Sequence, residues 1–370
     1  MFNHRYTSFS ELGRGIEVKK PNLVFFIPII PSEVSKLHFI NRFIVELEDT
    51  FKIQVFTESP VGNKVSEEVS QLCVNLNEIS HLPMSKIIRN EFQSFNHLDT
   101  TIINFSSPWL YKNVAYLKLM FPWLKVIDFM FNSHRLKHHL NISELIDLTI
   151  VQYKSFKNLL NASDGHGPIS INSLGVDTEF FVRQEKPVRN GIMKFGWIGR
   201  NSPEKRLEQF YSLSKIFTGQ AFFEVVSLDI KSIEKKLYDK YSNMKLVSLD
   251  NDENKLKWYK SLDVLINTSS IEGVPISVLE ARSLGIPLVS YDIGGISDVY
   301  TNRLDSFLIN SDNFSDLLNC VRKIIQNPKT IDTLKENLTI NFPDISITTA
   351  VDKMRKDINF VRSQFHKKLL

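Results

Sequence analysis

The sequence predicts an α/β protein built from two doubly wound domains that face each other across a cleft. At 370 residues, the chain is too long for one ordinary hydrophobic core. From about residue 20, short apolar runs alternate with longer amphipathic stretches, which is typical of parallel strands separated by helices. The alternation breaks in a polar stretch at residues 182–192 and then restarts, which indicates a linker between two arrays.

The first array predicts a parallel sheet with both faces covered, and we place the N-terminal domain at residues 1–185. Its strands are near-continuous apolar runs, as expected where both faces of a sheet are buried. The predicted strands are residues 23–30, 53–57, 101–107, 125–131, 148–152 and 168–173, and the predicted helices are residues 34–47 and 109–121.

The second array predicts another sheet of the same kind, and we place the C-terminal domain at residues 186–345. A further amphipathic helix within residues 346–370 is expected to pack back towards the N-terminal domain. The predicted strands are residues 195–199, 221–227, 245–249, 263–269 and 286–291, and the predicted helices are residues 203–217, 230–241, 253–262, 275–285 and 314–326.

Composition excludes several classes of protein. The net charge of +4 is too small to indicate nucleic-acid binding, although it suits an anionic ligand or membrane surface. Cys73 and Cys320 lie far apart, so neither a disulfide framework nor a zinc site is indicated. The polar N-terminus lacks the apolar core of a signal peptide, and no apolar run is long enough to span a bilayer. We therefore expect a cytoplasmic protein.

Residues 269–285 predict an anion site at the end of a buried strand. Residues 269–273 form the loop at the carboxyl end of that strand, where ligands bind in open α/β sheets. Pro275 suits the first position of the next helix, whose first turn offers free N–H groups to a phosphate. Glu280 follows on that helix and could accept from a ribose diol, while Glu272 lies in the loop. Each glutamate alone is more often a solvated charge, but the joint pattern favours a binding site.

A second stretch, residues 196–206, places two cations at the end of another strand. Arg200 lies in the loop and Lys205 at the start of the next helix. Arginine binds a diphosphate as a fork and lysine as a point charge, so the pair suits a diphosphate. Most of the 45 Lys and Arg residues must be surface cations, but the position at a strand's carboxyl end favours the functional interpretation.

Four passages resemble, in order, motifs of the retaining glycosyltransferases of family 4, which have the GT-B fold of two Rossmann-like domains. SLGVDTEFF is similar to Asn-Gly-Val-Asp-x-x-x-Phe, and GRNSPEKR to Gly-Arg-x-x-x-x-Lys-Gly. LDVLINTSSIEGVPISVLEA is similar to the strand that leads into Glu-x7-Glu, and GIPLVSYDIGG to Gly-x-Pro-Val-Val…Gly-Gly. The match covers roughly residues 168–326, and the N-terminal half matches in architecture only.

The resemblance implies a role for each matching residue. Arg200 and Lys205 would bind the diphosphate of a nucleotide-diphospho-sugar and stabilise the leaving group, and Glu280 would hold the ribose. Glu272 would meet the hydroxyls of the donor sugar together with loop residues, which are Gly273, Val274, Pro275 and Ile276. Such enzymes use no metal and no cofactor, because the cations and the helix end neutralise the departing nucleotide.

The expected function is transfer of a hexosyl or N-acetylhexosaminyl group, with retention, to a glycan or lipid-linked acceptor. The setting implied is cell-surface polysaccharide assembly at the inner face of the cell membrane, with peripheral association with anionic lipid and no nucleic-acid partner. Two alternatives stay open. One is a catalytically silent sugar-nucleotide-binding or scaffold subunit, and the other is an epimerase of the same fold.

The chain also departs from the family pattern. Phe131 stands where the family commonly has a histidine that contacts the donor sugar, and Asn132 or His134 could substitute for it. Arg206 replaces the glycine of the Lys-Gly pair. The triplet at residues 250–252 resembles a metal-binding Asp-x-Asp but reads as a solvated turn. The His-, Lys- and Arg-rich residues 134–139 read as a basic face that suits phospholipid.

Overall fold

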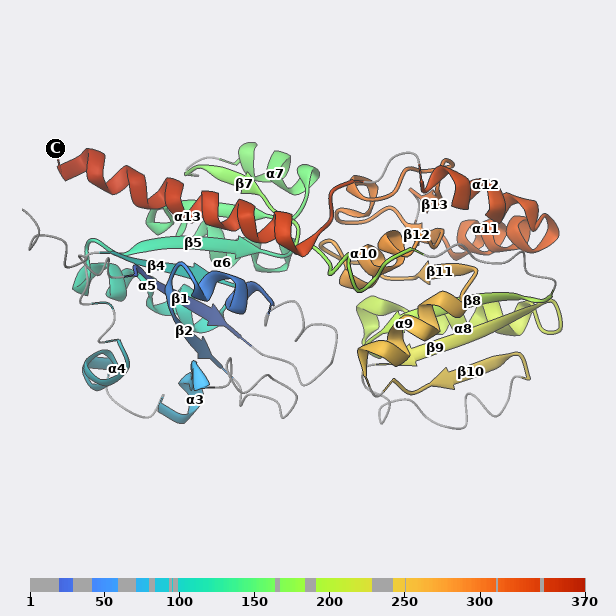
Figure 1. The fold of residues 1–370 in the computed structure, drawn as a ribbon, viewed down its shortest axis with the longest axis horizontal. Helices are drawn as coiled ribbons and strands as arrows, with labels where there is room; N and C mark the ends of the chain where they lie inside the picture. Colours follow the sequence, from blue (N-terminus) through green and yellow to red (C-terminus); the bar gives the residue numbers. More distant parts are fainter. Residues whose placement is uncertain are drawn as a thin grey trace, which may run out of the picture.

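The computed structural model describes most of the chain in two α/β domains. The described residues are 20–28, 42–58, 71–79, 84–92, 95, 99–163, 167–183, 191–227, 242–249, 251–310, 312–339 and 343–369. Figure 1 shows the domains side by side along the long axis of the molecule, with the C-terminal helix running back over the first domain.

The first domain is built on a seven-stranded sheet in the order β3-β2-β1-β4-β5-β6-β7. Every neighbouring pair of strands is parallel. The long strands are apolar and almost wholly buried, which is why they occupy a sheet covered on both faces. The strands are β1 (Asn22–Ile27), β2 (Lys52–Thr57), β3 (Cys73–Asn75), β4 (Thr100–Asn104), β5 (Lys125–Met130), β6 (Leu148–Val151) and β7 (Ile169–Ile171).

Helices cover both faces of the first sheet. On one face, α5 begins at Pro108 after the N-cap Ser107 and packs its buried stripe into the core below. On the other face, α13 contributes Val351, Met354 and Ile358 to a second core. The helices of this region are α3 (Leu76–Ile79), α4 (Met84–Glu91), α5 (Pro108–Met120), α6 (Leu136–Leu140) and α7 (Lys154–Asn161), with the C-terminal α13 (Ile347–Leu369).

The second domain is built on a six-stranded sheet in the order β10-β9-β8-β11-β12-β13, and its strand pairs are also parallel. Its strands are β8 (Met193–Gly199), β9 (Ala221–Ser227), β10 (Met244–Val247), β11 (Val264–Asn267), β12 (Leu288–Tyr291) and β13 (Ser306–Ile309). Its helices are α8 (Leu207–Ile216), α9 (Asp252–Ser261), α10 (Ile276–Ser283), α11 (Phe314–Gln326) and α12 (Lys329–Asn337), with the 3-10 turn η5 (Pro203–Lys205) before α8.

The predicted fold class, two parallel-sheet α/β domains, is confirmed. The sequence did not predict strands β3 and β13 or helices α3, α4, α6, α7 and α12, whereas α11 has the predicted limits. The predicted helix at residues 203–217 is divided into η5 and α8. Residues 34–41 of one predicted helix and all of the predicted helix at residues 230–241 lie outside the described residues.

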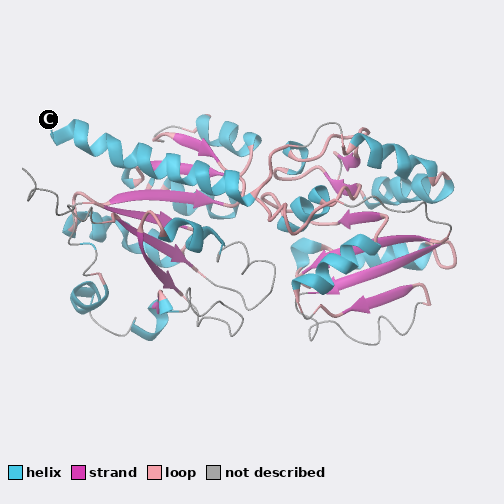
Figure 2. Ribbon diagram, in the orientation of Figure 1, coloured by secondary structure: helices cyan, strands magenta, loops and turns pink. Residues whose placement is uncertain are grey.

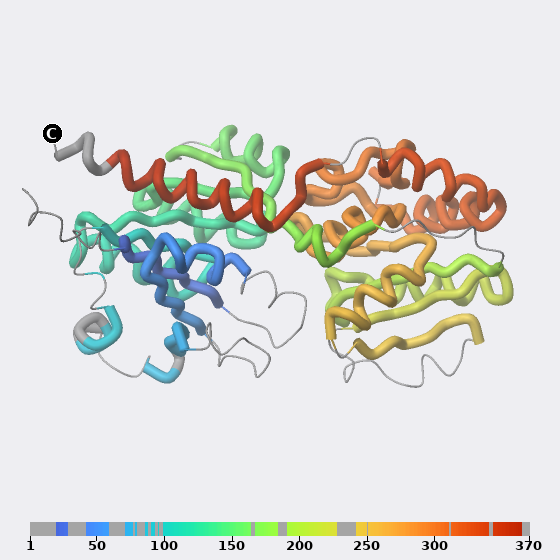
Figure 3. The backbone as a smooth tube through the Cα atoms, viewed as in Figure 1, coloured from blue at the N-terminus to red at the C-terminus, as the bar shows by residue number. Residues whose placement is uncertain are grey.

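The two domains meet at the carboxyl ends of their strands. Figure 2 shows the arrowheads of both sheets directed towards the junction. One hydrophobic cluster crosses the junction and contains Met130 and Tyr153 from the first domain with Val274 and Ile296 from the second. The chain also crosses back before α13 (Figure 3), where Ile347 N–H donates to the Val176 carbonyl at 2.8 Å. Across the described part of the chain, no helix has the length and apolarity that crossing a membrane requires.

Candidate functional site

The candidate site lies where the strand order of the second sheet reverses. The neighbours β8 and β11 end side by side, although their last residues, Gly199 and Asn267, are far apart in the chain. The loops that follow such strands diverge, so the sheet has a natural opening for a ligand at this edge. The loop after β8 carries Arg200 and Lys205, and the loop after β11 carries Glu272.

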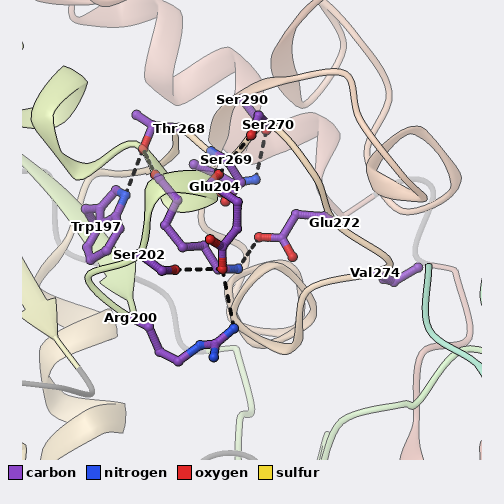
Figure 4. A network of polar contacts seen from close by, with 12 residues as sticks. Trp197, Arg200, Ser202, Glu204, Thr268, Ser269, Ser270, Glu272, Val274 and Ser290 are labelled. Atoms are coloured by element: carbon purple, nitrogen blue, oxygen red, sulfur yellow. Dashed lines mark hydrogen bonds and ion pairs between the residues drawn. The ribbon is translucent and has the colours of Figure 1, made fainter. Parts of the chain in front are cut away.

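The structure brings Lys205 and Glu272 together as an ion pair. The Lys205 Nζ donates to Glu272 Oε1, and the two side chains are 19% and 11% exposed. The Lys205 carbonyl accepts from Thr268 Oγ1 at 2.6 Å, and Thr268 Oγ1 in turn accepts from Trp197 Nε1 at 2.9 Å. Figure 4 shows this chain of contacts from β8 through the two loops. The Lys205 backbone is therefore held in place, and its ammonium group binds the Glu272 carboxylate.

Arg200 lies beside this pair and is more exposed. Its Nη2 is 3.5 Å from Glu204 Oε1, and its side chain is 49% exposed. Glu204 also accepts from Ser202 Oγ at 2.6 Å, and this hydroxyl, ahead of Arg200 and Lys205, holds the pKa of Glu204 below its usual range. The Glu204 carbonyl accepts from the Ser270 N–H at 2.8 Å, which ties the two loops together. The sequence analysis did not select Glu204. Its position four residues after Arg200 was the one sequence feature that indicated an ion pair.

The loop after Glu272 is held by close packing. Helix α10 begins at Ile276, with Pro275 as its N-cap, one residue later than predicted. A side chain at Gly273 would place its Cβ 2.1 Å from the Phe131 carbonyl oxygen, so only glycine fits there. The Val274 N–H donates to Gln152 Oε1 at 2.8 Å and Pro275 has no N–H. Among the described residues, the first helical N–H groups without an acceptor are therefore those of Ile276 and Ser277.

Glu280 is buried and already paired. Its carboxylate accepts from Lys255 Nζ at 2.5 Å and from Tyr259 OH at 2.8 Å, and the residue is 2% exposed. Burial raises the pKa of Glu280, and the Lys255 ammonium opposes that shift. Both partners come from α9, which the sequence did not connect with the site. The predicted contact of Glu280 with a ribose stays a prediction.

Arg206 departs from the family pattern in residue type but keeps the backbone conformation that glycine favours. Its φ of 50° and ψ of 46° lie in the left-handed region, which favours the glycine that the family has at this position. The Arg206 guanidinium donates to both carboxylate oxygens of Asp312 and lies 5.7 Å from the centre of the Tyr291 ring. These contacts hold a conformation that arginine rarely adopts.

The N-terminal domain reaches the Glu272 loop through the Phe131 carbonyl and the Gln152 amide. The Phe131 ring stacks on Phe105 at 5.6 Å, and its carbonyl points at Gly273. Asn132 Oδ1 accepts from the His134 N–H at 2.9 Å and caps the turn after β5, and His134 is exposed. Asn251 caps α9, while Asp250 lies outside the described residues. Among the residues described, no group of three or more His, Cys, Asp or Glu could hold a metal ion.

Comparison with known proteins agrees with the geometry. Residues 182–339 match the family Glycosyl transferases group 1, so this region is a domain of that type. A UDP-Gal:alpha-D-GlcNAc-diphosphoundecaprenol alpha-1,3-galactosyltransferase from Escherichia coli is 26% identical over 208 residues, 50% of this chain and 53% of the relative. The capsular polysaccharide biosynthesis glycosyltransferase CapM from Staphylococcus aureus is 20% identical over 231 residues, 60% of this chain and 59% of the relative. The chain thus spans little more than half the length of these relatives.

Solved structures share the whole architecture. The crystal structure of Anabaena Alr3699/HepE in complex with UDP-glucose has a TM-score of 0.72 at 12% identity and covers 92% of this chain and 99% of its own. Sucrose-phosphate synthase from Thermosynechococcus elongatus has a TM-score of 0.72 at 13% identity, with coverage of 94% and 100%. At this identity the likeness establishes the fold, which is that of the GT-B glycosyltransferases.

Proposed function

We propose that this protein is a retaining glycosyltransferase of family 4 that moves a sugar from a nucleotide-diphospho-sugar to a glycan or lipid-linked acceptor without a metal ion. The observation that carries the proposal is the Lys205–Glu272 pair, which lies at the strand-order reversal. A cation and an anion are held there within reach of each other, beside the N-terminus of α10.

The ion pair suggests how the site works. A donor diphosphate competes with Glu272 for Lys205, because a phosphate oxygen is a strong acceptor for an ammonium group. Arg200 and the N–H groups of Ile276 and Ser277 add positive potential where negative charge develops on the leaving group. Once displaced from Lys205, the Glu272 carboxylate is free to accept from hydroxyls of the donor sugar.

The reaction needs no further reactant. The bond between the sugar anomeric carbon and the β-phosphate oxygen breaks, and the acceptor oxygen forms a bond to that carbon on the same face. The acceptor proton passes to the departing phosphate oxygen, so the products are the glycosylated acceptor and the nucleotide diphosphate. The protein contributes position and fixed charge, chiefly through Lys205 and Arg200.

The relatives suggest which donor and acceptor to test first. The E. coli relative is named for UDP-Gal and a diphosphoundecaprenol acceptor, and the Anabaena structure holds UDP-glucose. The S. aureus relative is named for capsular polysaccharide biosynthesis. We therefore propose a UDP-sugar donor of the hexosyl or N-acetylhexosaminyl class and a role in cell-envelope polysaccharide assembly on the cytoplasmic side.

We further propose that the face formed by α5 and α6 meets an anionic membrane, where a lipid-linked acceptor lies. Along α5, Tyr116, Leu119 and Met120 are 39%, 75% and 47% exposed, and Leu140 at the end of α6 is 38% exposed. Tyr111 of α5 and His138 of α6 are in ring contact, so the two helices adjoin.

The charge of this face supports the same partner. Helices α5 and α6 carry Lys112, Lys118 and Lys137 and no acidic residue. Lys112 and Lys137 are exposed, while Lys118 Nζ is paired with Asp147 Oδ2 at 2.7 Å. Exposed apolar side chains next to cations are typical of surfaces that insert at the interface of an anionic bilayer.

A thermal-shift screen tests the donor assignment. We expect UDP, UDP-glucose and UDP-galactose to raise the melting temperature, with free glucose and galactose as controls that do not. A ligand at 100 times its dissociation constant stabilises the folded state by about 2.7 kcal/mol. If no nucleotide diphosphate or nucleotide-sugar shifts the melting temperature, the proposal fails. Binding without any release of nucleotide in the presence of acceptor would favour the silent subunit, and conversion of the free nucleotide-sugar would favour the epimerase.

A further inference from the structure

Gln152 connects the N-terminal domain to the loop that carries Glu272. It follows β6 directly, and its Oε1 accepts from the Val274 N–H at 2.8 Å across the domain junction. Both residues are 3% exposed. The contact joins positions that are 122 residues apart in the sequence.

Backbone packing leaves this loop little freedom. At Gly273, an added Cβ would lie 2.0 Å from Gln152 Oε1 and 2.1 Å from the Phe131 carbonyl oxygen. From the other side, the Gly295 N–H donates to the Gly273 carbonyl at 2.8 Å, and a Cβ at Gly295 would lie 2.6 Å from Tyr153 Cβ. The segment 272–274 is thus clamped between the ends of β5 and β6 and the turn at residues 294–295.

The chemistry of the amide fixes its orientation. The Oε1 must face the Val274 N–H, because the flipped amide would set two donors against each other. In this orientation, Nε2 is buried and has no hydrogen-bond partner among the described residues. A buried amide N–H group left unpaired is destabilising, so stability alone does not account for a glutamine at this position. What Gln152 provides is an acceptor, Oε1, for the Val274 N–H of the loop.

We propose that Gln152 is a positioning residue for Glu272, and that it makes the geometry of the Glu272 loop depend on docking of the N-terminal domain. The inference rests on the proposed function, in which Glu272 meets the donor sugar. Glu272 is two residues from the fixed N–H, so loss of the contact moves its carboxylate relative to the sugar. Lys205 and Arg200 stand on a different loop and keep their hold on the diphosphate.

The test compares Gln152→Met with Asp298→Ala. Methionine keeps the length of the side chain but offers no comparable acceptor, so kcat should fall about tenfold or more, as expected for a misplaced catalytic group. The dissociation constant of UDP should stay within about twofold. Asp298 Oδ2 accepts from the Lys154 N–H at 2.9 Å across the same junction without touching the loop, so Asp298→Ala should retain kcat. Equal loss in both variants, or unchanged kcat in Gln152→Met, would overturn the proposal.

A second measurement does not depend on activity. Hydrogen exchange of the backbone around Val274 should be faster in Gln152→Met than in the wild type. The separate variant Gln152→Glu keeps an acceptor oxygen, so its exchange should be as slow as in the wild type. Exchange that is equally slow in Gln152→Met, or equally fast in both variants, contradicts the contact. A wild type that binds no nucleotide would instead refute the proposed function while leaving this exchange result interpretable.

Discussion

At the residue scale, the main finding is that the Glu280 carboxylate is bound by two side chains of α9. A carboxylate in a core is tolerated when both of its oxygens are satisfied, as they are here by Lys255 and Tyr259. Removal of one member leaves the other as an uncompensated buried charge. Glu280 thus anchors α10, whose first turn forms part of the candidate site, to α9.

This burial gives Glu280 a signature in the pH dependence of stability. Because burial raises its pKa above the ordinary value of 4.5, the folded state holds the proton more tightly than the unfolded state. The stabilisation that Glu280 contributes to the folded state is therefore fully present below the pKa of the unfolded state. It is lost as pH rises through the raised pKa of the folded state. The difference in unfolding free energy between wild type and Glu280→Gln should therefore shrink from pH 4 upwards in urea titrations. A difference that is constant or grows with pH would contradict the assignment.

Sequence reasoning selected the candidate residues that carry a local pattern. Lys205 and Glu272 follow separate strands, and each was assigned to the donor site because ligands bind at the carboxyl ends of parallel strands. Gln152, Lys255 and Glu204 were not found, because each acts through a partner that the sequence does not place beside it. A single glutamine after a buried strand has no distinguishing pattern until its partner is known.

At the element scale, the lengths and ends of the helices set what the site offers. Because α10 begins at Ile276, Val274 stays in the loop and its N–H is available to Gln152. The helix α5 presents opposite faces to the core and to solvent, with Leu117 buried and Leu119 exposed. Apolar periodicity predicted the buried stripe of α5. The exposed apolar side chains of α5 could be recognised only once the packing around the helix was known.

The exposed stripe of α5 makes a testable prediction. The wild type should sediment with vesicles that contain phosphatidylglycerol and should be released by salt, because the attraction to anionic lipid is screened. Leu119→Glu should abolish sedimentation. Leu159→Glu is the matched control, since Leu159 is 47% exposed on α7. Equal binding by wild type and Leu119→Glu, or equal loss in the control, would refute the membrane face.

At the scale of the whole molecule, two parallel sheets present their carboxyl ends to each other, and the candidate site lies at that junction. The alternation of strands and helices was enough to predict both domains. The docking between them was not predictable, because it depends on close backbone contacts such as that of Gly273 with Phe131. Those contacts depend on the shapes of loops that have no periodicity.

The most direct test of the account measures release of nucleotide diphosphate from the donor found in the screen, with lipid-linked glycan acceptors and excess EDTA. We expect release by the wild type and a rate about 10²–10³-fold lower in Lys205→Ala, as for loss of a donor aimed at developing charge. Lys215→Ala, an exposed cation of α8, should match the wild type. Wild-type release by Lys205→Ala, or release that requires added magnesium or manganese, would contradict a metal-independent transferase centred on Lys205.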